Sequence, residues 1–286
     1  MASSDRSSMP LRKPVSRTGP DGWTLLPLEP FGVLIEGDLS RPLSETAQAL
    51  LVELVDTHGI VAARGQTLTL DQQRDLLRPL GRVPIERHVD VAPDDGALGR
   101  LALTYHSDFA FAPQPYKYLS LYGVDLDPGS VTRFVDAASA YDRLNDAQRA
   151  RLGHLQATAI CLDRCDDVAY YEFPQHVPQF TRPAILAHPR TGRPILYVNE
   201  AQTARLEPLA RAESDAFRAE LFALLYTPGT ILEWQWSEGD LLIWDNLALQ
   251  HGRPPTDEVR RRRLRRGAVA DVDAEEMLPQ MFAALG

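Results

Sequence analysis

The sequence predicts a mainly β fold with helices packed outside it, in the form of a double-stranded β-helix, or jelly-roll. Two observations lead to this prediction. Short apolar runs of strand length recur along the 286 residues, and helical patterns stand between some of them. Two histidines and an aspartate also stand at the ends of such runs, and many strands around a buried metal fit a jelly-roll.

Helices are predicted where a capping residue precedes an apolar periodicity. Thr69 and Gln72 have the spacing of a capping box, so a helix should begin there and end near residues 79–81. Asn145 and Gln148 have the same offset. An earlier helix is expected after a cap at Ser44, with an apolar face made of Ala47, Leu50, Leu51, Leu54 and Val55.

The predicted strands and helices follow one another in short blocks without an internal repeat. Besides the helices after Ser44 and Thr69, helices are expected over residues 137–144, 146–152 and 214–225. The strands are expected over residues 32–35, 59–63, 118–124, 132–135, 195–198, 231–236, 241–245 and 261–269.

The length and composition indicate one enzyme-sized domain. No Pro/Gly/Ser linker divides the middle of the chain, and the candidate metal ligands come from both halves. We therefore expect a single domain over residues 22–286. Residues 1–21 are rich in Ser, Arg and Pro and have no apolar core, so they are expected to be a disordered tail and not a signal peptide.

Charge and cysteine content restrict the partners. A formal net charge of -9 argues against a general nucleic-acid or membrane-surface role. Cys161 and Cys165 are too few for a disulfide scaffold, and no stretch of 18 apolar residues exists. We expect a cytoplasmic protein with a small-molecule substrate, no nucleic acid and no membrane, and a homodimer is compatible with the sequence.

The most informative motif is His106-Ser107-Asp108, followed far along the chain by His251. Two imidazoles and one carboxylate form the ligand set that leaves three positions open on non-haem Fe(II). The near pair stands at i and i+2, the spacing that puts two side chains on one face of a strand. A structural pair at a strand end is the alternative. His188, in a His-Pro turn, is expected to be structural.

Arginines occupy every position from 260 to 266 except Leu264. Strand alternation would direct Arg262, Leu264 and Arg266 to one side, and Arg261, Arg263 and Arg265 to the other. An inward arginine needs an anion, and its planar guanidinium pairs with a carboxylate through two hydrogen bonds. The outward arginines are expected to form a solvated, acid-paired face. Binding of nucleic acid by this run is the alternative.

These residues together resemble the taurine/2,4-D, or taurine dioxygenase-like, family of Fe(II)/2-oxoglutarate-dependent dioxygenases. The resemblance also covers residues 31–44, residues 58–81, and residues 188–192 continuing to Tyr197-Val198-Asn199-Glu200. It covers the stretch from Trp234 to His251, which includes Trp244-Asp245-Asn246. It therefore spans roughly residues 22–269, which is most of the chain.

The resemblance implies a function and a set of ligands. His106, Asp108 and His251 would hold Fe(II), and Arg262 with Thr132, beside Arg266, would bind 2-oxoglutarate. Reaction with O2 would oxidise the substrate, in the default case by hydroxylation, and release succinate and CO2. No catalytic residue beyond the metal centre is implied. Desaturation, cyclisation and C–X cleavage are alternatives at the same iron, and a non-catalytic metal or 2-oxoglutarate sensor is an alternative of another class. Because Asp108 is present, halogenation is not expected.

The substrate pocket departs from the taurine pattern. Glu86 stands where taurine enzymes have a histidine, Ala102 replaces an asparagine, and Tyr105 replaces a tryptophan, while Arg266 is retained. A carboxylate in place of a histidine opposes a sulfonate. We therefore expect a small polar substrate, amino-acid-like or from a natural-product pathway, and not taurine. It would be contacted by Glu86, Tyr105, Phe109 and Arg266, beneath an aromatic, proline-rich segment over residues 170–180.

Overall fold

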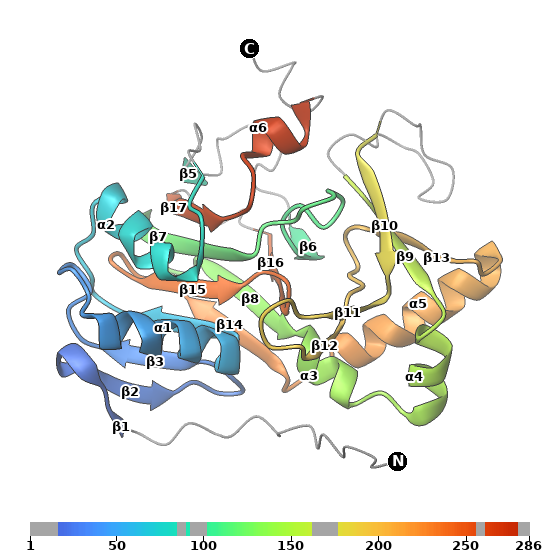
Figure 1. Ribbon diagram of the computed structural model, residues 1–286, viewed down its shortest axis with the longest axis horizontal. Coiled ribbons are helices and arrows are strands. Elements are labelled where there is room, and N and C mark those ends of the chain that lie inside the picture. Colours follow the sequence, from blue (N-terminus) through green and yellow to red (C-terminus); the bar gives the residue numbers. More distant parts are fainter. Residues whose placement is uncertain (1–16, 85–89, 92–101, 162–176, 256–260, 280–286) are drawn as a thin grey trace.

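Two facing β-sheets form the centre of the molecule, a computed structural model that describes residues 17–84, 90–91, 102–161, 177–255 and 261–279 (Figure 1). The larger sheet contains, in spatial order, β1 (Arg17–Thr18), β2 (Thr24–Pro27), β3 (Val33–Glu36), β4 (Ile60–Ala63), β15 (Leu241–Asp245), β7 (Tyr118–Leu126), β17 (Arg262–Val269) and β5 (Asp90–Val91). The smaller sheet contains β14 (Ile231–Gln235), β8 (Val131–Asp136), β16 (Leu249–Arg253) and β6 (Leu103–His106).

The space between the two sheets is filled by apolar side chains. Leu119 and Leu121 of β7 pack in one buried core with Trp244 of β15, Phe134 of β8 and Trp234 of β14. Since alternate residues of a strand point to opposite faces, these residues line the inner face of each sheet. This sandwich with flanking helices confirms the jelly-roll class predicted from the sequence.

The outer face of the larger sheet is covered by α1 (Glu45–His58) and α2 (Leu70–Leu77). Tyr118 and Tyr122, which alternate with the inward leucines of β7, pack there against Leu51 and Leu54 of α1 and Leu77 of α2. β7 is thus buried on both faces, which fixes the strand at the centre of the fold.

A second helical layer lies on the other side of the molecule (Figure 1). One buried cluster joins its helices to two small sheets. The helices are α3 (Ala137–Asp142), α4 (Asp146–Leu152) and α5 (Arg211–Leu225), and the sheets are β10 (Gln179–Pro183), β9 (Gln156–Ile160) and β13 (Thr203–Glu207), and β11 (Ile185–Ala187) with β12 (Pro194–Leu196). Short helical turns complete the fold at η1 (Pro20–Gly22), η2 (Arg78–Leu80) and α6 (Ala274–Met277).

The predicted helix caps are confirmed. The Ser44 hydroxyl accepts a hydrogen bond from the Ala47 N–H at the start of α1. Thr69 with Gln72, and Asn145 with Gln148, each form a complete capping box at the start of α2 and α4. Each box satisfies two N–H groups that a helix start would otherwise leave without a partner.

The start of α5 differs from the sequence prediction. The helix begins at Arg211 and not at Ser214. Ser214 has the residue type of a cap, but its hydroxyl accepts a hydrogen bond from the Leu206 N–H of β13 and ties the helix to that strand. The strands of the β10–β9–β13 sheet were not predicted, because their charged and polar residues hide the alternation, as in Gln179–Pro183.

The strand predicted over residues 241–245 is confirmed as β15, and after it the chain changes sheet. β15 ends at Asp245, and β16 begins at Leu249 in the other sheet. The Asp245 carboxylate accepts hydrogen bonds from the Leu247 and Ala248 N–H groups, which turns the chain between them. Sequence periodicity alone does not register this change of sheet.

The expected N-terminal tail lies mostly outside the described residues. Of its last five residues, Arg17 and Thr18 pair with β2, and Pro20 and Asp21 belong to η1. The single domain over residues 22–286 stays a prediction. Among the described residues, no helix is both long and apolar enough to cross a membrane.

Loss of the capping box at α2 should destabilise the fold measurably. Thr69→Ala removes the hydroxyl that accepts from the Gln72 N–H, and we expect a loss of about 1 kcal/mol in the free energy of unfolding. Urea denaturation measures it. Thr57→Ala, at an exposed position near the end of α1, is the matched control and should change stability by less than about 0.5 kcal/mol. Equal effects of the two substitutions would contradict the cap assignment.

Candidate metal centre

Three candidate ligands converge at the edge where β6 and β16 pair. His106 is the last residue of β6, and His251 is its direct partner on β16. Asp108 Oδ1 lies 3.3 Å from His106 Nε2 and 3.6 Å from His251 Nε2. One ligand atom from each residue falls within 4.8 Å of the others, which is a spacing that one metal ion could bridge.

Asp108 reaches this point from a turn and not from the strand. β6 ends at His106, and the Ala110 N–H donates to the Ser107 carbonyl in the following turn. The sequence argument that placed both side chains on one strand face is therefore wrong in its geometry. The two side chains still meet, because the turn folds Asp108 back towards the β16 ligand.

The two imidazoles are turned so that they could bind a metal. His106 Nδ1 lies 2.9 Å from the Thr104 carbonyl, an acceptor only, so Nδ1 carries a proton and Nε2 is the nitrogen that faces Asp108. Burial lowers the pKa of His251 to about 3, with the neighbouring His106 adding to the effect. The His251 ring is therefore neutral near pH 7, which is the form that binds metals.

The carboxylate of Asp108 is kept ionised. Burial by itself raises the pKa of Asp108, but the hydrogen bond with His106 and the nearby His251, His106 and Arg266 outweigh it and hold the pKa below its usual range. Arg266 Nη1 lies 3.6 Å from Asp108 Oδ2. Two imidazoles and one carboxylate are a donor set that fits Fe(II).

A cavity of about 90 Å³ adjoins the three candidate ligands. Leu119, Leu121 and Trp244 provide apolar walls, and Thr132, Arg253, Arg262 and Arg266 provide the other polar groups. Among the described residues that line the cavity, three carry guanidinium groups and one, Asp108, carries a carboxylate. These guanidinium groups could bind an anionic ligand.

Arg262 and Thr132 lie together at this cavity. Arg262 Nη2 donates to the Thr132 hydroxyl at 3.2 Å, and the indole N–H of Trp236 donates to the same oxygen at 2.9 Å. The hydroxyl therefore keeps its own proton for a third partner. Burial, and after it the charge of Arg253, lower the pKa of Arg262 to about 9, so a bound anion would stabilise the charged form.

The alternation predicted for the arginine run is present in β17. Arg262, Leu264 and Arg266 face inward. The pairing of β17 with β7 is irregular at one point, where Val124 of β7 is left out of the register, so β17 itself stays regular. Arg261 is exposed and binds Asp125 and Asp127, as an acid-paired face requires.

Arg265 differs from the expected acid-paired pattern. Its guanidinium donates to the Gln73 side chain and the Leu68 carbonyl, and it lies over the Tyr122 ring at 4.6 Å. This outward arginine therefore holds α2 and the chain before it against the larger sheet.

Two predicted substrate residues lie away from the cavity. Tyr105 precedes His106 on β6, points to the opposite face, and stacks on Tyr226 with ring centroids 4.5 Å apart. Phe109, with a φ of 60°, packs against Phe111 and Tyr116. Neither lines the cavity as described. Glu86 falls outside the described residues.

Sequence reasoning missed Arg253. It is buried, stands two residues after His251 on β16, and lines the same cavity. The alternation of β16 could have indicated it, since i and i+2 share a face. His188, expected to be structural, is buried and contacts Asp245 and the main chain of the following turn.

Comparisons with known proteins identify the family to which the chain is similar. The family described as taurine catabolism dioxygenase TauD, TfdA matches residues 24–268. Pentalenolactone F synthase of Streptomyces avermitilis is 26% identical, with 90% of this chain and 97% of the relative covered. The α-ketoglutarate-dependent 2,4-dichlorophenoxyacetate dioxygenase of Cupriavidus pinatubonensis is 28% identical, with 86% and 96% covered. A crystal structure of a taurine dioxygenase from Burkholderia xenovorans superposes with a TM-score of 0.76 at 23% identity, covering 88% of this chain and 91% of that one.

Removal of one candidate ligand should abolish metal binding. His106→Ala or Asp108→Ala leaves two donors at a site that needs three, so we expect no saturable Mn(II) or Fe(II) binding in an anaerobic titration. His154→Ala, at an exposed position after α4, is the control and should bind like the unaltered protein. Unchanged binding in either ligand variant would place the metal elsewhere.

Proposed function

The chain belongs to the TauD, TfdA family of taurine catabolism dioxygenases, and we propose from this that His106, Asp108 and His251 bind the Fe(II) with which it oxidises a small polar substrate. Enzymes of this kind are oxidoreductases that use Fe(II), 2-oxoglutarate and O2. The observation that carries the proposal is the convergence of the three ligand atoms beside a buried, arginine-lined cavity.

The chemistry of the bound metal follows from its open positions. Fe(II) held by His106, Asp108 and His251 would keep three positions open, and it would supply the oxidation of the substrate by O2, coupled to conversion of 2-oxoglutarate to succinate and CO2. Asp108 stays ionised and His251 stays neutral, which are the forms in which these side chains bind a metal.

Arg262 and Thr132 are the proposed partners of the far carboxylate of 2-oxoglutarate. The planar guanidinium of Arg262 offers paired N–H donors to a carboxylate, and the Thr132 hydroxyl has its own proton left to donate. Arg253 adds a further positive charge to the same cavity. A carboxylate of a dicarboxylic acid would pair with these hydrogen-bond donors and positive charges better than a neutral molecule would.

Arg266 is proposed to bind an acidic group close to the metal. Its guanidinium lies beside Asp108, so an anion bound to it would place the rest of the molecule next to the reacting position. Leu119, Leu121 and Trp244 would contact the apolar part. A small organic acid fits this combination, either amino-acid-like or a natural-product intermediate. The relative named for 2,4-dichlorophenoxyacetate has a substrate of this chemistry, an acid group on an apolar body.

Hydroxylation is the proposed outcome. The position of the substrate relative to the metal would decide between it and desaturation, cyclisation or C–X cleavage. No feature of the described residues favours a non-catalytic sensor. Anaerobic addition of Fe(II) and 2-oxoglutarate, followed by a screen for acids that perturb the resulting spectrum and then release succinate under O2, tests the proposal. Failure of every metal and 2-oxoglutarate addition to change the spectrum would refute it.

Binding of 2-oxoglutarate should depend on the shape of the Arg262 side chain. Arg262→Lys keeps the charge but loses the planar pair of donors, so we expect the dissociation constant to rise about tenfold, on the order of 1–2 kcal/mol. Anaerobic titration of the metal-loaded protein measures it. Arg261→Lys, at the exposed position directly before β17, is the matched control and should leave the constant unchanged. An unaltered titration for Arg262→Lys would assign the co-substrate to another arginine.

Glu86 should determine the affinity for substrates that carry a charge. Glu86→Gln should weaken the binding of a substrate that carries a cationic group and leave Fe(II) and 2-oxoglutarate affinity unchanged, because we expect Glu86 to contact the substrate and not the metal. Competition against the spectral change of the anaerobic complex measures the affinity. Efficient hydroxylation of taurine, or a Glu86→Gln variant indistinguishable from the unaltered protein, would overturn this assignment alone.

A further inference from the structure

Asn246 lies in the turn that leads into β16, the strand of the proposed iron ligand His251. Its side chain binds the main chain of another proposed ligand, Asp108. It is fully buried and follows β15. Its Oδ1 accepts a hydrogen bond from the Asp108 N–H at 2.9 Å, and its Nδ2 donates to the Asp108 carbonyl at 3.0 Å. Both main-chain groups of Asp108 are thus held by a single amide that lies 138 positions away in the sequence.

The remaining bonds of Asn246 fix the amide itself. Nδ2 also donates to the Tyr116 carbonyl at 2.8 Å, and the Asn246 N–H donates to the Lys117 carbonyl at 2.9 Å. Two carbonyls accept from Nδ2 and one N–H donates to Oδ1, so the orientation of the amide is determined by its partners. With its backbone fixed on both sides, the Asp108 carboxylate keeps only its side-chain torsions.

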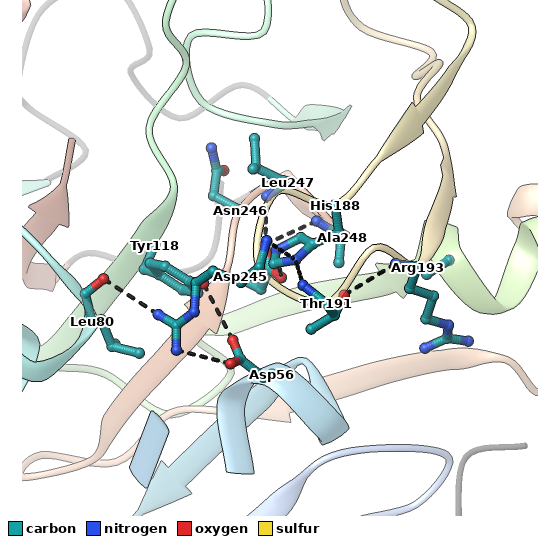
Figure 2. A network of polar contacts seen from close by, with 12 residues as sticks. Asp56, Leu80, Tyr118, His188, Thr191, Arg193, Asp245, Asn246, Leu247 and Ala248 are labelled. Atoms are coloured by element: carbon teal, nitrogen blue, oxygen red, sulfur yellow. Dashed lines mark hydrogen bonds and ion pairs between the residues drawn. The ribbon is translucent and has the colours of Figure 1, made fainter. Parts of the chain in front are cut away.

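The turn that carries Asn246 is anchored by the residue before it. The Asp245 carboxylate accepts from the Leu247 and Ala248 N–H groups and lies 2.8 Å from His188 Nε2 (Figure 2). His188 Nδ1 accepts from the Thr191 N–H, so the other ring nitrogen, Nε2, is the one that faces Asp245. β16 begins directly after this turn and presents His251.

We propose that Asn246 is a positioning residue of the metal centre: it sets the Asp108 carboxylate relative to His251, because its amide binds Asp108 while its own turn, held by Asp245, leads into the His251 strand. This inference rests on the proposed function. Outer partners that orient a ligand typically change metal affinity by about 10- to 100-fold when they are altered. Asn246 differs from the usual case because it orients the ligand through the main chain and never touches the carboxylate.

Asn246→Asp is the sharpest variant. It keeps the shape of the side chain but replaces the donor that faces two carbonyls by a carboxylate oxygen, so the Asp108 carbonyl is repelled instead of bound. We expect the Mn(II) dissociation constant of the full chain, read anaerobically from the EPR signal of free Mn(II), to rise about 10- to 100-fold. The visible spectrum of the Co(II)-loaded protein should change as well, because the ligand geometry changes.

Gln66→Glu is a matched control. The Gln66 amide also donates to two main-chain carbonyls, those of Gly37 and Arg64, and also accepts from one main-chain N–H, that of Leu39. It does not line the cavity. Gln66→Glu should therefore lower the melting temperature through the same donor loss, yet bind Mn(II) within twofold of the unaltered protein and keep its Co(II) spectrum.

The outcomes separate positioning from general destabilisation. Mn(II) binding within twofold of normal in Asn246→Asp, or an equal loss of affinity in Gln66→Glu, would overturn the proposal. If Asn246→Asp does not fold, Asn246→Ala, which removes the donor without repulsion, is judged by the same two measurements. His106→Ala distinguishes failure of the proposed metal site from failure of the role of Asn246. If His106→Ala binds Mn(II) as well as the unaltered protein does, the proposed metal site is wrong. If His106→Ala loses Mn(II) binding, the Asn246 variants test the role of Asn246 alone.

Discussion

Antiparallel pairing of β6 with β16 sets His251 directly opposite His106, and the candidate site depends on that register. A shift of one residue would turn His251 away from the cavity and bring Gln250 or Gly252 into its place. Several contacts oppose such a shift. Gln250, on the other face of β16, donates to the Val198 carbonyl and accepts from the Tyr226 hydroxyl, and β8 pairs along the same strand. The strand is therefore held by polar bonds on its outer face and by apolar packing on its inner face.

The interior between the sheets combines apolar packing with an unusual excess of positive charge. Arg253 and Arg262 are each less than about a tenth exposed and face the same cavity as Arg266. Burial of a cation is unfavourable, and it lowers the pKa of both Arg253 and Arg262. A dianionic co-substrate would relieve the repulsion as it binds. The same arrangement that is unfavourable for the empty fold therefore becomes a source of affinity and of selectivity for acids.

Much of this could be predicted from the sequence because it depends on local rules. Thr69 with Gln72 and Asn145 with Gln148 mark helix starts through contacts within one turn, and alternation in β17 separates Arg262 from Arg261. Prediction failed where the position of a residue depends on contacts with residues far away in the sequence. Ser214 looks like a cap but bonds to Leu206, and Asp108 meets His106 through a turn that Asn246 holds. The resemblance to the family predicted that Tyr105 contacts the substrate. The alternation of β6 instead turns its ring towards Tyr226, and that alternation could have been used.

The irregularity opposite β17 bears on how this chain can change through evolution. The extra residue, Val124, is on β7, so the four-residue interval from Arg262 to Arg266 remains uninterrupted. Loss or gain of one residue within that interval would turn one of these two arginines outward. Arg262 and Arg266 would then no longer line the same cavity. An extra residue in β7 has been absorbed without that effect. Descendants of this protein should therefore vary in β17 by substitution only, without change in its length.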